Sequence, residues 1–77
     1  MAQVRLFAGA AEAAGAAELT VDAPTVGALR AALGGVARLG TVLDRCALLV
    51  DGRRASDDAE PVPASATVDV LPPFAGG

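Results

Sequence analysis

The chain ends with Ala66-Thr-Val-Asp-Val-Leu71 and then Pro72-Pro73-Phe74-Ala75-Gly76-Gly77, and this stretch decides the fold. Its first half alternates apolar and polar residues, which predicts a strand with Val68 and Val70 facing the core. Thr67, Asp69 and Leu71 then face the other way. Neither proline can donate to a sheet ladder, so the strand is expected to stop at Leu71. We therefore expect one domain over residues 1–71 and a flexible tail over residues 72–77.

The tail is predicted to be presented to another protein. Pro72-Pro73 favours a stiff polyproline II exit, and six extended residues span roughly 20 Å, enough to enter a partner's cleft. Gly76 and Gly77 have no Cβ, so a partner could close around the backbone while the terminal carboxylate of Gly77 advances as the reacting group. The alternative is a frayed terminus without a function.

A first strand over residues 3–8 is the expected neighbour of the last one. Val4 and Leu6 alternate with Arg5 and Phe7, which indicates one buried face. If this strand lies parallel beside the last, Phe7 and Leu71 come together on the opposite face. Two large apolar residues on a solvent face, next to the root of the tail, suggest a docking patch. Scattered exposed apolar residues are normal in proteins, which is the alternative interpretation.

The middle of the chain predicts one good helix and more strands. Thr25 is a candidate N-cap, the apolar residues recur with helical spacing, and Gly34-Gly35 is a stop signal. Before this helix we expect a short helical turn over residues 9–14 and a strand over residues 18–22; after it, an irregular helical segment over residues 36–43. The apolar residues of the main helix are Val26, Leu29 and Leu33.

The second half predicts a hairpin and a loop. Residues 46–50 are a strand candidate, and Asp51-Gly52 is the dipeptide favoured in a two-residue turn, with residues 53–55 returning. Residues 56–64 are expected to be a loop whose three acidic side chains are solvated, although they could also bind a cation. The chain is therefore assigned to the α+β class, with a mixed sheet and one main helix packed on one face.

Composition excludes several classes of function. The net charge is −3, all six positive side chains are arginine, and histidine, tyrosine and tryptophan are absent, which argues against nucleic-acid binding. Cys46 is the single cysteine, so a disulfide framework, a zinc site and a Cys-His nucleophile pair are excluded, and we expect a buried thiol and no metal. No apolar stretch is long enough to span a membrane and no signal peptide is expected, which favours the cytoplasm.

Three stretches of the sequence together resemble one known family. They are Leu6-Phe7-Ala8 with Ala11-Glu12 and Gly15, then Thr25-Val26 with Leu29 and Leu33, then Leu71-Pro72-Pro73 with Ala75-Gly76-Gly77. The chain resembles the small subunit of molybdopterin synthase, within the ubiquitin-like sulfur carriers that share the β-grasp fold. The resemblance covers nearly the whole length, and the proline pair with the terminal Gly-Gly is its most specific part.

The resemblance implies a carrier that is not itself a catalyst. Gly77 would be adenylated by an E1-like enzyme that uses ATP, and converted to a thiocarboxylate with sulfur from a sulfurtransferase or a cysteine desulfurase. In the molybdopterin case two small subunits and a dimer of the large subunit form a heterotetramer, and each tail enters an active site where a pterin precursor acquires its dithiolene sulfurs. This chain supplies no acid, base or metal ligand for these steps and no bound cofactor is expected, so the catalyst must lie in the partner.

The resemblance also implies contact residues. Phe7 and Leu71 match positions that the family uses as apolar contacts with partners, whereas Arg54 stands where an apolar contact residue is common. Phe74 replaces a smaller aliphatic residue.

Three further functions are compatible with the sequence. A carrier for thiamine thiazole or cysteine biosynthesis is the nearest, although thiazole carriers usually lack the helical insertion of residues 9–15 and the Pro-Pro. A ubiquitin-like modifier, joined through Gly77 to lysines of target proteins, is the second. The third is an interaction domain with an inert tail.

Overall fold

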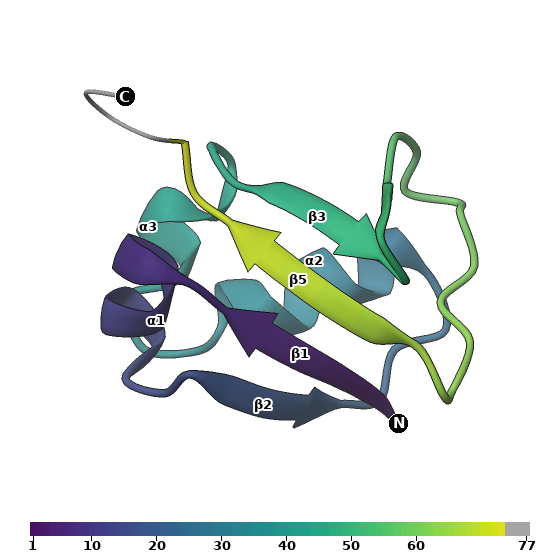
Figure 1. The fold of residues 1–77 in the computed structure, drawn as a ribbon, viewed down its shortest axis with the longest axis horizontal. Coiled ribbons are helices and arrows are strands. Elements are labelled where there is room, and N and C mark those ends of the chain that lie inside the picture. The colour runs from purple at the N-terminus through teal and green to yellow at the C-terminus, as the bar shows by residue number, and fades with distance from the viewer. Residues whose placement is uncertain (74–77) are drawn as a thin grey trace.

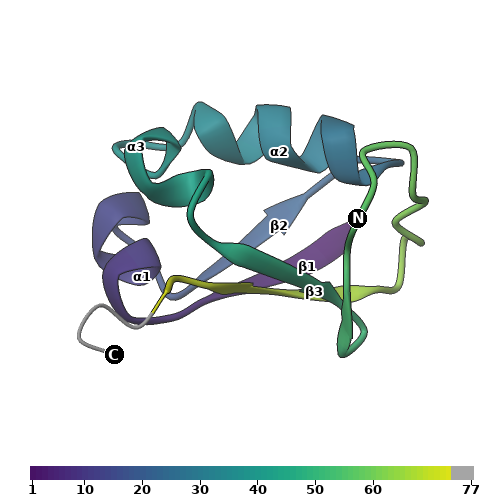
Figure 2. The same cartoon turned by 90° about the horizontal axis from the view of Figure 1, so that it is seen from above.

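The computed structural model describes residues 1–73, and within them one five-stranded mixed sheet is covered on one face by three helices (Figures 1 and 2). The strand order is β2-β1-β5-β3-β4. Helix α2 crosses the middle of the covered face, and α1 and α3 lie together near one end of it. In chain order the elements are β1 (Ala2–Leu6), α1 (Ala8–Ala14), β2 (Glu18–Val21), α2 (Val26–Gly34), α3 (Gly40–Leu43), β3 (Ala47–Val50), β4 (Arg53–Arg54) and β5 (Thr67–Leu71).

The first and last strands lie side by side at the centre of the sheet, which is the pairing considered from the sequence. β1 and β5 are parallel, with Val4 opposite Val68 and Leu6 opposite Val70. β5 is also antiparallel to β3, while β2 and β4 form the two edges. This arrangement, with helices on one side of the sheet, confirms the α+β class and the ubiquitin-like β-grasp architecture.

The main helix has the start and the end that its sequence indicates. The Thr25 side chain accepts a hydrogen bond from the Ala28 N–H at 3.2 Å, which satisfies one of the free donors of the first turn. The loop supplies two more acceptors, because the backbone oxygens of Glu60 and Asp58 accept from Val26 and Gly27 at 2.9 Å each. The start of α2 therefore holds the 56–64 loop against the domain.

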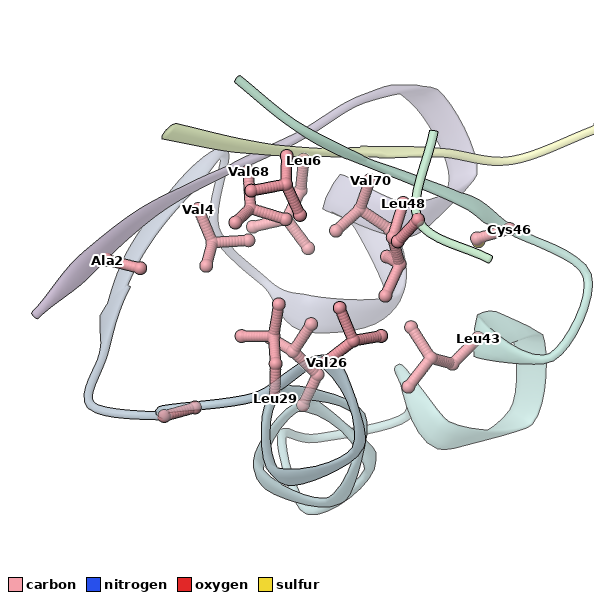
Figure 3. Packing of buried hydrophobic residues seen from close by; sticks show 14 of the residues in the cluster. Ala2, Val4, Leu6, Val26, Leu29, Leu43, Cys46, Leu48, Val68 and Val70 are labelled. Carbon is pink, nitrogen blue, oxygen red and sulfur yellow. The ribbon is translucent and has the colours of Figure 1, made fainter. Parts of the chain in front are cut away.

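The core lies between α2 and the covered face of the sheet (Figure 3). Val4, Val68 and Val70 of the sheet and Leu29 and Leu33 of α2 are fully buried, and Figure 3 shows Val26 and Leu29 directed from the helix toward the strands. The inward positions predicted for β1, α2 and β5 are thus confirmed. Burial of these side chains is the main source of stability, at about 25 cal/mol per Å² of apolar surface.

The hairpin prediction is also confirmed. Asp51 and Gly52 both have positive φ angles, 50° and 85°, which is the conformation of a type I′ turn. The Asp51 carboxylate also accepts a hydrogen bond from the Thr67 N–H at 2.9 Å. This contact ties the turn to the beginning of β5.

Most element boundaries differ from the sequence prediction by one or two residues, and α3 begins at Gly40 where a helical segment from residue 36 was expected. Three of these shifts have a local cause in the backbone. The first strand ends at Leu6, because Ala8 has a φ of 50° and begins α1. Cys46 precedes β3, since its N–H and its thiol donate to the Leu43 and Val42 oxygens at 3.0 and 3.3 Å. Ala66 precedes β5 because its N–H turns back to the Pro63 oxygen at 3.0 Å.

The acidic loop is less solvated than expected. Asp57 and Asp58 are exposed, but the Glu60 side chain is only 13% exposed and lies 2.9 Å from the Arg53 guanidinium. The two groups approach as an ion pair without hydrogen-bond geometry, which leaves Glu60 Oε2 buried and without a hydrogen bond among the described residues. Within residues 1–73, no three acidic, cysteine or histidine side chains gather where they could hold a metal ion.

Candidate partner-binding face at the root of the tail

The candidate site is the face of the sheet that the helices leave uncovered, which is the face seen in Figure 1. Residues 1–73 enclose no pocket, so this site is an open surface. None of the helices in that range is long and apolar enough to cross a membrane. The uncovered face is made of the outward-pointing residues of all five strands, and register places them in rows that run across the sheet.

The row at the tail end is apolar. Ala47 lies opposite Leu71, and Phe7, one position beyond the Leu6–Val70 pair, donates its N–H to the Val70 oxygen at 3.3 Å. Phe7, Leu71 and Ala47 therefore lie on three neighbouring strand ends. Phe7 is 41% exposed, and Leu71 and Ala47 are partly exposed. The structure thus brings Phe7 and Leu71 together on the uncovered face, and adds Ala47, which the sequence reasoning had not singled out.

The next row carries the charges. In strand order it consists of Glu18, Arg5, Asp69, Leu49 and Arg54. The Arg5 guanidinium donates two hydrogen bonds to the Asp69 carboxylate, of 2.7 and 3.0 Å. These bonds, followed by the charge of Asp69, raise the pKa of Arg5 above its ordinary value. Arg5 and Asp69 therefore neutralise each other at the centre of the face.

Arg54 lies on the edge strand and is exposed. Its neighbour Leu49 separates it from Asp69, and within residues 1–73 no carboxylate oxygen lies within 4.0 Å of its guanidinium. The adjacent Arg53 is different because it is paired with Glu60. The three residues expected to contact partners thus share one face, with Phe7 and Leu71 in the apolar row and Arg54 in the charged row.

The tail begins beside the apolar row. β5 ends at Leu71, and Pro72 and Pro73 follow outside any strand. The predicted tail residues Phe74, Ala75, Gly76 and Gly77 lie outside the described residues. Cys46, the expected core thiol, is buried, and burial raises its pKa although the charge of Arg30 acts in the opposite direction.

Fold and surface together define a class: a ubiquitin-like β-grasp domain whose C-terminal residues continue from a central strand, beside an uncovered apolar row. A family model described as the ThiS family matches residues 4–77. The chain therefore belongs to the ThiS family, among the ubiquitin-like sulfur carriers. Comparison with curated protein sequences gives no significant match.

Solved structures agree with this assignment. The chain is similar to SAMP1 from Haloferax volcanii, with 30% identity and a TM-score of 0.77 over 99% of this chain and 98% of that one. A second structure, the small archaeal modifier protein 1 of the same organism, has 28% identity, covers 95% and 97% of the two chains, and gives a TM-score of 0.74. The complex of subunits 1 and 2 of molybdopterin-converting factor from Helicobacter pylori shares the fold, with 24% identity, a TM-score of 0.78 and coverage of 99% and 97%.

Proposed function

We propose that this chain is a cytoplasmic sulfur carrier and the small subunit of molybdopterin synthase. The observation that carries the proposal is the position of the apolar row: Phe7, Leu71 and Ala47 surround the point where the chain leaves the sheet toward Gly77. Six residues span at most about 20 Å. A protein that acts on the Gly77 carboxylate therefore has to sit close to this row.

The chemistry requires activation of Gly77 by a partner. A carboxylate is a poor electrophile, and the carrier contributes no group that would change this. In the proposed sequence, the Gly77 carboxylate attacks the α-phosphorus of ATP in the activating enzyme and releases pyrophosphate. A persulfide sulfur of the donor protein then attacks the acyl carbon and AMP leaves. A thiol reduces the resulting acyl disulfide, which leaves the thiocarboxylate on Gly77 and a disulfide elsewhere.

Two observations favour molybdopterin synthesis as the destination of the sulfur. The segment after β1 forms the helix α1, which ends at Gly15 in the left-handed conformation with φ of 77°; thiazole carriers usually lack this insertion. The fold is also that of a protein solved as a complex of two molybdopterin-converting factor subunits. On this proposal the large subunit accepts the tail, and the thiocarboxylate sulfur passes to the pterin precursor.

Mass spectrometry of the intact protein tests the proposal. The chain is incubated with ATP, the activating enzyme and the sulfur donor encoded in the same genome, and a variant lacking Gly77 serves as the control. We expect a mass gain equal to one oxygen-to-sulfur exchange on the full chain alone. The large subunit and the pterin precursor are then added, and formation of the dithiolene product identifies the pathway. A full chain that gains no sulfur would refute the carrier function.

A protein modifier is the second candidate, because a structure with 30% identity is that of SAMP1 and the related structure is described as a small archaeal modifier protein. Such a modifier would form an isopeptide bond between Gly77 and lysines of other proteins. The chain contains no lysine, so it could not build side-chain-linked chains on itself. Conjugates of higher mass that are lost when Gly77 is deleted would support this function, and their absence from cells that contain the thiocarboxylate would refute it.

A further inference from the structure

The charged row of the uncovered face suggests what the partner must present to this chain. From one edge strand to the other, the row reads Glu18, Arg5, Asp69, Leu49, Arg54. Asp69 is held by two hydrogen bonds from Arg5, one to each carboxylate oxygen, so its charge is already paired. The row contains two cations. Arg5 is paired with Asp69, whereas the Arg54 guanidinium has no carboxylate within 4.0 Å in residues 1–73.

Asp69 is too distant to neutralise Arg54. Neighbouring strands are about 4.8 Å apart, so the two residues, separated by β3, have backbones about 10 Å apart. The Asp69 charge is also already paired with Arg5, and exposed charges that do not form a direct ion pair are weakly coupled on a solvated surface at physiological ionic strength. Arg54 therefore remains a free positive charge on a protein whose net charge is −3.

A partner that covers the apolar row also covers Arg54. Ala47 of that row and Leu49 of the charged row lie on the same strand, two residues apart and facing the same way. Leu49 in turn lies directly opposite Arg54. A partner whose contact extends from Ala47 along β3 to Leu49 would remove water from the neighbouring guanidinium, and a desolvated cation is costly unless an acceptor replaces that water.

We propose that the activating enzyme presents a carboxylate to Arg54 at the edge of its contact with the apolar row, which makes Arg54 a specificity-determining residue. The planar guanidinium offers five donors and matches a carboxylate with two parallel hydrogen bonds. The inference rests on the proposed function, and the activating enzyme is chosen as the occupant because every candidate pathway requires activation of Gly77.

Substitution by leucine separates charge recognition from simple contact. In R54L the side chain stays large but loses its charge and its hydrogen-bond donors, so a partner that used only the aliphatic stem of Arg54 would still bind. R38L is the matched control, because Arg38 is exposed in the turn between α2 and α3 on the helix side and has no carboxylate within 4.0 Å in residues 1–73. Each variant changes the net charge from −3 to −4, since five arginines then face nine acids.

The readout is kcat/KM of the activating enzyme for the carrier in ATP–pyrophosphate exchange, at low and at high salt. We expect R54L to lose about tenfold or more relative to R38L at low salt, and this difference to shrink at high salt. A smaller difference between R54L and R38L at low salt, or a difference that high salt leaves unchanged, would overturn the inference about Arg54. The proposed function would not be affected by that result, provided that the unmodified chain supports exchange. No exchange with the unmodified chain would overturn both.

Discussion

Truncation of Phe7 to alanine tests whether the apolar row binds a partner. Phe7 is 41% exposed, and a phenylalanine residue has about 200 Å² of surface, so docking can bury about a further 80 Å². At about 25 cal/mol per Å², this corresponds to about 2 kcal/mol, or roughly a 30-fold loss of affinity in Phe7→Ala. The affinity for the activating enzyme can be measured by calorimetry with the full chain.

The same substitution is expected to cost less folding stability than truncation of a core residue. Part of the ring is already covered, and the alanine side chain retains some of that contact, so we expect a loss of about 1–2 kcal/mol. For a domain of this size, the melting temperature then falls by roughly 5–15 °C while the chain remains folded at room temperature. Leu29 is the contrast, because it is fully buried and its truncation to alanine should cost about 3–5 kcal/mol.

Two results would refute this reasoning. If Phe7→Ala unfolds the domain as Leu29→Ala does, Phe7 is a core residue and its exposed part is incidental. If Phe7→Ala stays folded and binds the activating enzyme within about threefold of the unmodified chain, partners do not use the row. Val42→Ala is the matched control for binding, because Val42 is a partly exposed apolar residue of α3 on the helix side.

The remaining expectations concern the tail, two glycines and the thiol. Deleting Gly77 should abolish thiocarboxylate formation and leave the melting temperature unchanged; a truncated chain that still gains sulfur would contradict this. Gly40→Ala should destabilise by about 1–3 kcal/mol, because its Cβ would lie 2.7 Å from the Gly34 oxygen, whereas Gly9→Ala in α1 meets nothing within 4 Å and should stabilise by up to about 1 kcal/mol. Denaturant unfolding of both variants tests this contrast. Burial raises the pKa of Cys46 in the folded chain, so the unfolded chain loses the thiol proton at a lower pH than the folded chain does. The free energy of unfolding should therefore fall as pH rises above about 8.5. Lysine, tyrosine and histidine are absent, so Cys46→Ala should flatten this alkaline decline in pH-dependent melting curves.

Sequence predicted the parts of the fold that short-range chemistry specifies. The Thr25 cap, the Gly34-Gly35 stop, the Asp51-Gly52 turn and the alternation in β1 and β5 each depend on neighbouring residues, and the structure confirms them. The boundary at Phe7 and Ala8 was wrong because alanine rarely adopts a positive φ, so nothing local indicated that the strand would turn there.

The contacts of the candidate site depend on register, which alternation does not fix. Arg5 and Asp69 were placed on one face, but their two hydrogen bonds require these residues to be direct neighbours across the β1–β5 pair. Ala47 joined the apolar row for the same reason, through its position opposite Leu71. Glu60 became nearly buried because Arg53 and the start of α2 hold its loop, which is a tertiary effect.

Under the proposed function a partner acts on the C-terminal residues, and the position of β5 then has a mechanical consequence. This strand is bonded on both sides, to β1 and to β3, and the ladder bonds lie across the strand direction. A partner that draws the chain end along the axis of β5 therefore loads these bonds together in shear, whereas an edge strand pulled from its side would open one bond at a time. The domain can act as an anchor that resists unravelling while its terminus is under tension.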